Sequence, residues 1–175
     1  YNTFEWIMNF SESCKIKSCF YFLCENTHPL NADYDINHPV IKNLLKNIYD
    51  RGHEIGLHPS YNSYKNKKQI LGEFNKLTKV CNQIGINQKK WGSRMHYLRW
   101  SHPTTLNICE SIGINYESTL GYPDLIGFRC GTSYEYQGFD IEKNEILKIR
   151  IRPLIAMDTT FLNHGYKNIK ESLLI

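Results

Sequence analysis

The chain has 175 residues, of which 41% are hydrophobic, and this is enough for one sizeable core. The net charge is only +4, and the one dense lysine cluster, at residues 65–68, opens an expected helix, so a solvated helix face explains it better than nucleic-acid binding. No apolar run approaches the roughly 18 residues that a membrane helix needs, and no signal peptide is visible. We therefore expect no nucleic-acid partner and no membrane segment in this chain.

The cysteine and aromatic content bear on the cellular compartment and on the kind of ligand that the protein could bind. The six cysteines include no CxxC pair, which favours buried free thiols in a reducing compartment over a disulfide framework or a zinc knot, and a cytoplasmic location is expected. The 12 tyrosines and 8 phenylalanines would suit a sugar-binding surface. Because the chain starts at Tyr1 and stops inside a helical pattern at residues 173–175, we expect a single domain over residues 1–175 that is truncated at both ends.

The first half of the chain alternates helical and strand patterns. Apolar residues at helical spacing predict a helix over residues 3–14, and a nearly continuous aromatic and apolar run predicts a strand buried on both faces at residues 16–24. A polar loop follows at residues 25–38, and loops of this length are often functional. A core-facing apolar stripe then predicts a helix over residues 39–51, before a short buried strand at residues 54–58.

The second half continues this alternation. A second amphipathic pattern covers residues 70–84, a short strand is expected at residues 91–96, and a helix is expected over residues 103–112. The remaining apolar pieces are at residues 116–120, 126–130, 146–151 and 154–157, and a last helix begins at residues 167–175. Strands alternating with helices imply parallel strands with helices packed outside, and this α/β pattern fits either an open sheet or a partial (β/α) barrel.

The stretch from Gly52 to Ser63 contains the first candidate site. His58 follows a buried strand and precedes a polar loop, a position that suits a metal ligand or a general base. The alternative is a histidine satisfied by a backbone hydrogen bond. His53 lies an odd number of residues earlier, so its side chain is expected on the opposite face and in a structural role.

Four cationic candidates follow at the ends of later strands. Arg94 and His96 are two residues apart and are expected to share one face of a strand, while Arg99 and Arg129 lie near other strand-to-loop edges. Together they could bind a carboxylate, a phosphate or a developing oxyanion. The alternative is a set of unrelated surface residues.

Three carboxylates lie near the same expected edges. Glu54, Glu117 and Asp158 could each be a base, a partner for an arginine or a helix cap, and capping is the commonest outcome for Asp158 because Thr159 and Thr160 follow it. The sequence contains no glycine-rich phosphate loop, nucleophile elbow or HExxH motif. Composition and spacing thus indicate an α/β domain with a polar site, and they specify no reaction.

Residues 52–58, Gly-His-Glu-Ile-Gly-Leu-His, resemble the second motif of the polysaccharide deacetylases of carbohydrate esterase family four. As in that family, an aromatic strand precedes this motif, at residues 18–22, and an arginine-containing strand end follows it, at residues 93–96. Further segments similar to a divergent bacterial subgroup are residues 112–122, 127–133 and 154–158. The resemblance covers roughly residues 16 to 160.

The resemblance implies an irregular (β/α) barrel and metal-dependent hydrolysis of an N-acetyl group on a glycan. The divalent metal, usually zinc, is held in the family by one aspartate and two histidines. His58 matches the first of these histidines, and the second would fall at Asn62, although asparagine is a much poorer zinc ligand. Arg94 matches the arginine that orients the catalytic carboxylate, and the usual proline two residues later is His96 here. The family's aspartate motif would precede Tyr1.

The function expected from this resemblance is removal of an N-acetyl group from a sugar in polysaccharide metabolism. The expected catalytic residues are Arg94 and His96, the expected metal ligand is His58, and the expected substrate-binding residues are Tyr61, Arg99 and Arg129. The family's last histidine motif has no clear counterpart, because His164 is a poor match.

The departures from the family pattern leave several alternatives. The ligand set could be changed, with His96 recruited to the metal, or metal and catalysis could be lost in a domain that only binds carbohydrate. A third possibility is an unrelated α/β domain that binds an anionic small molecule through Arg94, Arg99 and Arg129.

Overall fold

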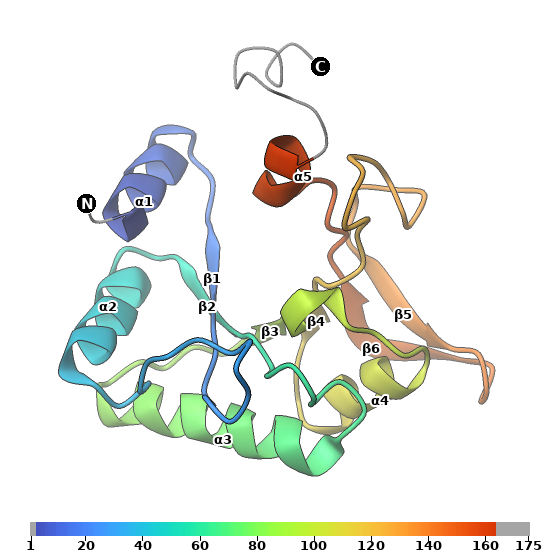
Figure 1. Ribbon diagram of the computed structural model, residues 1–175, viewed down its shortest axis with the longest axis horizontal. Coiled ribbons are helices and arrows are strands. Elements are labelled where there is room, and N and C mark those ends of the chain that lie inside the picture. The colour runs from blue at the N-terminus through green and yellow to red at the C-terminus, as the bar shows by residue number, and fades with distance from the viewer. Residues whose placement is uncertain (1–2, 164–175) are drawn as a thin grey trace.

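The computed structural model describes residues 3–163, and helices and strands alternate as far as residue 117, after which two further strands and a last helix follow (Figure 1). The helices are α1 (Thr3–Ser13), α2 (Pro39–Asp50), α3 (Lys67–Gln83), α4 (Thr104–Ser111) and α5 (Asp158–Asn163). The strands are β1 (Cys19–Phe22), β2 (Glu54–Leu57), β3 (Gly92–Ser93), β4 (Tyr116–Glu117), β5 (Tyr136–Asp140) and β6 (Glu145–Ile151). A short 3₁₀ turn spans His96–Leu98.

The strands of residues 3–163 form one six-stranded sheet in the order β1-β2-β3-β4-β6-β5. Neighbouring strands from β1 to β6 run parallel, and only β5 is antiparallel, to β6. In this part of the chain the sheet is not closed, since β1 and β5 are its two edges. The mixed α/β class with a mostly parallel sheet is therefore confirmed.

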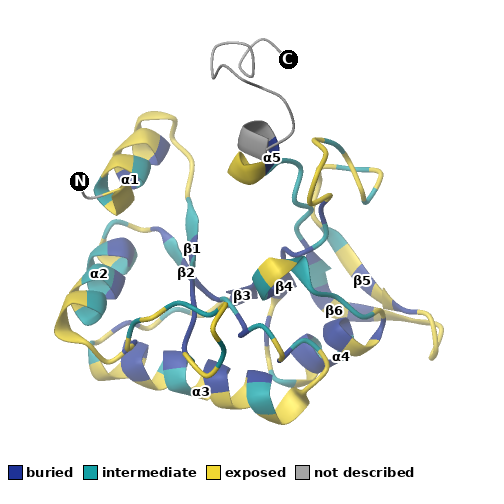
Figure 2. Ribbon diagram, in the orientation of Figure 1, coloured by how far each residue is buried: buried dark blue, intermediate teal, exposed yellow. Residues whose placement is uncertain are grey.

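Three helices cover one side of this sheet. Figure 1 shows α2, α3 and α4 in a row along it, and buried and exposed positions alternate along each of them (Figure 2). Leu45 and Ile48 of α2 and Leu77 of α3 are fully buried, as are Ile55 and Leu57 of β2. The predicted amphipathic stripes thus supply one shared core with the inner face of the sheet.

Two of the remaining apolar pieces lie in the loops after β4 and β6. Residues 126–130 and 154–157 form no strands, and a hydrogen bond joins the two loops, with the Gly127 N–H donating to the Ile155 carbonyl at 2.9 Å. Asp158 therefore follows a loop instead of a strand, and it accepts a hydrogen bond from the Thr159 N–H in the first turn of α5. The expected helix at residues 167–175 lies outside the described residues, as does His164.

All six cysteines are free, as the sequence predicts, and Cys24, Cys81 and Cys109 are buried. Burial in apolar surroundings raises the pKa of the Cys81 thiol to about 12, so this thiol stays protonated at neutral pH. Among residues 3–163, no helix has both the length and the apolar character needed to span a membrane.

Candidate functional site

One face of the sheet is apolar and packs on the helices, and the other face carries polar and aromatic side chains. Along β2, Ile55 and Leu57 are fully buried, whereas Glu54 and His58 are half-buried on the opposite face, because successive side chains of a strand alternate. Tyr21 of β1 is also only half-buried, so the prediction that this strand is buried on both faces is wrong. His58 directly follows β2, at the carboxyl edge where parallel sheets bind ligands.

Two glycines make room for tyrosine rings on the polar face. A Cβ atom on Gly56 would overlap the ring of Tyr21, and a Cβ atom on Gly92 would overlap the ring of Tyr116. The Tyr116 side chain can therefore cross β3 and reach β2, where its hydroxyl donates to Glu54 Oε2 at 2.6 Å. The two glycines thus let aromatic side chains fill the polar face without breaking the strand register.

Glu54 is the partner of an arginine. Arg152 follows β6, and its Nη1 donates to Glu54 Oε2 at 2.8 Å while its guanidinium carbon lies 3.4 Å from the centroid of the Tyr116 ring. Burial opposes ionisation of Glu54, but the hydrogen bonds from Tyr116 and Arg152 hold its pKa below the usual value. This carboxylate therefore links β2 to the end of β6 as a charged structural contact.

The two histidines of the Gly52–Ser63 stretch have different surroundings. His53 is buried and its Nδ1 accepts a hydrogen bond from the Ser18 N–H at 3.1 Å, which confirms a structural role. His58 Nδ1 lies 2.5 Å from the Arg94 carbonyl, and its Nε2 lies 2.9 Å from Nδ1 of His96. Burial, followed by the neighbouring His96, lowers the pKa of His58 to about 4, so its imidazole is neutral at physiological pH.

Arg94 is fixed by Ser118 at the end of β4. Its Nε donates to the Ser118 carbonyl at 3.0 Å, its Nη2 donates to the Ser118 hydroxyl at 2.8 Å, and its guanidinium carbon lies 4.8 Å from the centroid of the Tyr21 ring. These contacts orient the guanidinium of Arg94. Arg94 and His58 line the same cavity, of about 260 Å³, so this charged group lies beside His58. Besides Tyr21, the other residues around this cavity are Phe4, Cys19 and Phe20.

The expectation that Arg94 and His96 share one face of a strand is wrong. β3 ends at Ser93, and the Met95 N–H leaves the strand ladder to donate to the Thr119 hydroxyl at 2.8 Å. The chain then enters the 3₁₀ turn, which places the His96 ring edge-on against His58 at 4.8 Å between ring centroids. The two residues therefore contact His58 in different ways. Arg94 contacts it through its backbone carbonyl and lines the same cavity, and His96 contacts it through its ring.

Tyr61 is the centre of an aromatic cluster beside this pair. Its ring stacks on His28 at 4.6 Å and lies edge-on to Tyr97 at 5.4 Å and to His96 at 6.4 Å, as distances between ring centroids. The Arg99 guanidinium carbon lies 4.2 Å from the same Tyr61 ring. Tyr61 and Arg99 thus lie beside His96.

Asn62 and Arg129 have other partners. The Asn62 amide oxygen accepts a hydrogen bond from Arg99 Nη1 at 2.9 Å, and Arg129 Nη1 donates to the Gly121 carbonyl at 2.8 Å. Over residues 3–163 no hydrogen bond or ring contact joins either side chain to His58 or Arg94. The structure therefore gathers His58, Arg94, His96, Tyr61 and Arg99 and does not bring Arg129 to them.

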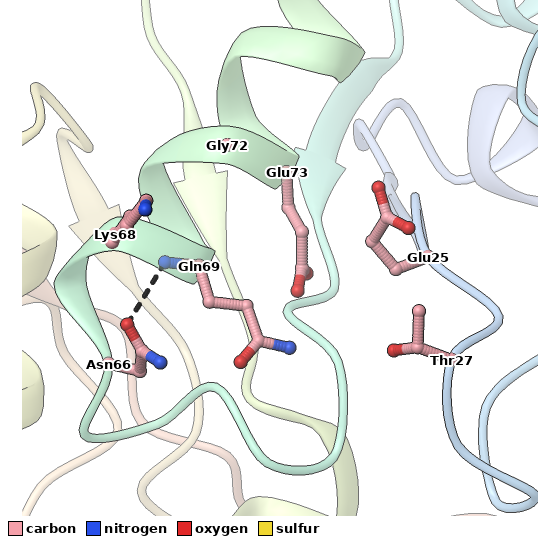
Figure 3. Close-up of a pocket in the computed structure, with 7 residues that line it drawn as sticks. All are labelled: Glu25, Thr27, Asn66, Lys68, Gln69, Gly72 and Glu73. Atoms are coloured by element: carbon pink, nitrogen blue, oxygen red, sulfur yellow. Dashed lines mark hydrogen bonds between the residues drawn. The ribbon is translucent and has the colours of Figure 1, made fainter.

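A buried carboxylate fixes the loop that follows His58. Glu73 of α3 accepts hydrogen bonds from both the N–H and the hydroxyl of Ser60, and burial raises its pKa. Figure 3 shows Glu73 and Glu25 on opposite sides of a second cavity, of about 400 Å³, at the start of α3. We interpret Glu73 as the group that holds residues 58–63 in place.

Sequence reasoning missed Tyr21, Ser118 and Tyr97. Tyr21 could have been found because it alternates with apolar residues in β1, whereas its position opposite Gly56 is known only from the register. Ser118 and Tyr97 carry no local signal, since only the pairing of β3 with β4 and the 3₁₀ turn bring them to the site.

Glu117 points to the opposite, helix-covered face and is completely buried. It accepts hydrogen bonds from the N–H and the hydroxyl of Thr119, but burial outweighs them and raises its pKa from 4.5 to about 7. The folded protein therefore favours the protonated acid, and the resulting stability is complete below pH 4.5 and is lost as the pH rises through 7. The difference between these two pKa values corresponds to about 3 kcal/mol.

We expect Glu117→Gln to be less sensitive to pH than the wild type. Its free energy of unfolding relative to the wild type should rise by about 3 kcal/mol between pH 4.5 and pH 7, as measured by urea unfolding at several pH values. Glu54→Gln is the matched control with the opposite sign, because the lowered pKa of Glu54 gives stability that is present above pH 4.5 and lost below it. Parallel pH profiles for Glu117→Gln and the wild type would contradict the assignment.

Among residues 3–163, no group of three or more histidine, cysteine, aspartate or glutamate side chains is placed to hold a metal ion. The inner nitrogens of His58 and His96 nevertheless approach each other, and imidazole nitrogens are preferred zinc ligands, so this pair fits two positions of such a ligand set. Comparisons of the chain with protein-family models and with curated proteins find no match.

Proposed function

We propose that the chain is a metal-dependent hydrolase that removes an N-acetyl group from a sugar of a polysaccharide. The observation that carries this proposal is the imidazole of His58 beside the fixed guanidinium of Arg94 in one cavity at the carboxyl edge of a parallel sheet. A neutral imidazole is a ready metal ligand, and a fixed arginine can stabilise the negative charge that develops on an acyl oxygen.

Each residue of the site has a proposed role. A divalent metal such as zinc, when bound at His58, would polarise the acyl carbonyl and lower the pKa of a water. The guanidinium of Arg94, held by Ser118, orients a carboxylate or the developing oxyanion. We assign His96, whose ring lies against His58, to act with it in catalysis, and we assign Tyr61 and Arg99 to the substrate-binding side of the site. Arg129 stays on this side only as a prediction from the sequence, since its guanidinium donates to the Gly121 carbonyl.

The same proposal extends to the fold and to the cellular location. The parallel neighbours β1-β2-β3-β4-β6 follow chain order, as they do in an irregular (β/α) barrel, and we assign the chain to this fold. The six free thiols fit a reducing compartment, and we assign the protein to the cytoplasm.

Tyr97 is the exposed aromatic residue next to the histidine pair. Its ring is edge-on to His96 at 4.8 Å between centroids, its side chain is 62% exposed, and its backbone is left-handed, with φ at 55°. A left-handed backbone at a non-glycine residue costs about 1–2 kcal/mol, and such strain is concentrated at functional sites. We assign the exposed ring to stacking against a sugar.

Replacing Tyr97 by alanine is expected to raise KM for an N-acetylglucosamine oligomer by roughly two- to tenfold, with kcat little changed, because the ring is lost and His58 and Arg94 are kept. Tyr134→Ala is the matched control, since Tyr134 is another exposed tyrosine, at 82%. Tyr97→Gly should lose the same affinity and unfold at a higher temperature than Tyr97→Ala, because glycine relieves the strain. An unchanged KM in both Tyr97 variants would refute the stacking role.

The function is tested by measuring acetate release from N-acetylglucosamine oligomers by the zinc-loaded protein. Acetate release that requires the metal supports the proposal, and its absence contradicts it. The alternative is a carbohydrate-binding domain without catalysis, which is favoured by the contact of Asn62 with Arg99 instead of His58. Binding of the oligomers without acetate release would establish this alternative.

A further inference from the structure

The outer nitrogens of the two paired histidines both face carbonyl groups. His58 Nδ1 lies 2.5 Å from the Arg94 carbonyl oxygen, and His96 Nε2 lies 2.6 Å from the Leu30 carbonyl oxygen. A carbonyl oxygen can only accept a hydrogen bond, so each of these two nitrogens must carry a proton. The carbonyls therefore fix the tautomer of both rings.

The inner nitrogens are then left in an unfavourable arrangement. In a neutral imidazole one nitrogen carries the proton and the other carries a lone pair, so His58 Nε2 and His96 Nδ1 both present lone pairs. They face each other at 2.9 Å, with the two rings nearly perpendicular. Two lone pairs at this distance repel each other unless a cation lies between them, and that cation is either a proton or a metal ion.

Two features favour a metal ion. Zinc–nitrogen bonds of about 2.0–2.1 Å in a tetrahedral site place two ligand nitrogens about 3.3 Å apart, so the pair must open by about 0.4 Å and the two rings must turn until their lone pairs converge on one point. Histidines that bind metal almost always donate their other N–H to a carbonyl, a carboxylate or a water, which orients the ring. Both His58 and His96 have such a carbonyl partner.

We propose that His58 and His96 together hold the divalent metal, so that His96 replaces the second histidine that would fall at Asn62. This inference deepens the proposed function, because it assigns the metal ligands of the same site. His96 is contributed by the 3₁₀ turn after β3, and its ring is oriented by Leu30 in the loop after β1. Three separate loops at the carboxyl edge of the sheet thus assemble the metal site.

The experiment is a zinc titration of the metal-free 175-residue chain, followed by calorimetry and by NMR of ¹⁵N-labelled histidines. We expect one zinc per chain, and resonance shifts at His58 Nε2 and His96 Nδ1. His58→Ala and His96→Ala should each weaken zinc binding about a hundredfold or more. Asn62→Ala is the matched control and should bind zinc as the wild type does. Circular dichroism of each variant verifies that it is folded.

Several results would overturn the proposal. A zinc affinity that is unchanged in His96→Ala removes His96 from the ligand set. A zinc affinity that falls as far in Asn62→Ala as in His96→Ala contradicts the proposal that His96 replaces a ligand at Asn62. If the His96 variant does not fold, wild-type spectra decide, because zinc that shifts only the His58 resonance contradicts the pair. A wild-type protein that binds no zinc shows that the pair shares a proton only.

Failure of this assignment and failure of the proposed function give different results. Zinc bound by both histidines without acetate release removes the hydrolase proposal and keeps the ligands. Acetate release that requires zinc, with a zinc affinity that His96→Ala does not change, keeps the hydrolase and removes His96 as a ligand.

Discussion

His58→Ala is expected to abolish both zinc binding and acetate release. The substitution removes the Nε2 lone pair from the cavity, and the methyl group of alanine has no atom that can bind a metal. It also leaves the Arg94 carbonyl and His96 Nδ1 without their partner in a half-buried site, which should cost about 1–3 kcal/mol of stability. Zinc content and acetate release are measured on purified protein, and urea unfolding is measured in parallel.

The stability cost separates a functional loss from misfolding. His102→Ala is the matched control, because His102 is an exposed histidine of the same chain. This control should keep the zinc content, the acetate release and the unfolding free energy of the wild type. A folded His58→Ala protein that retains all of its zinc would disprove the metal assignment.

Arg94→Ala is expected to lower kcat about 10²- to 10³-fold while the fold is kept, because a fixed positive group at the reacting centre is removed. The guanidinium makes its hydrogen bonds to the main chain and side chain of Ser118 on the neighbouring strand, and the residue is only half-buried. KM should change less than kcat if Arg94 acts mainly in the transition state. Steady-state kinetics of acetate release give both constants.

A second variant distinguishes the charge of Arg94 from its geometry. Arg94→Lys keeps the positive charge but cannot make the two-point contact with Ser118, so its kcat should fall between those of Arg94→Ala and the wild type. Arg150→Ala is the control for loss of a surface arginine, since Arg150 pairs with Glu135 and lies outside the cavity. Full activity in Arg94→Ala would remove this residue from the catalytic site.

The long loop after β1 contributes to the site through its backbone and through one amide side chain. The Leu30 carbonyl contacts His96, and the Asn31 side-chain oxygen accepts a hydrogen bond from the Tyr61 N–H at 3.0 Å. This loop therefore helps to orient His96 and Tyr61, two residues of the proposed site. The composition of residues 25–38 alone gave no indication of which group they would present.

Local patterns in the sequence determined the helices, the α/β class and the position of His58. Apolar spacing identified α2 and α3, because a helix that packs on one side must repeat apolar residues every 3.6 positions. The short apolar run ending at His58 identified β2. These features depend on residues that are close in sequence, and a single sequence therefore contains enough information to predict them.

Only the tertiary structure decided how the site is assembled. His58 and His96 are 38 residues apart, and their contact depends on the early end of β3, on the hydroxyl of Thr119 and on the Leu30 carbonyl. β5 likewise has a weak pattern of its own and is ordered by pairing with β6. Such long-range contacts leave no periodic signal in the sequence, because each is made by one residue that meets a distant partner only after the sheet has formed.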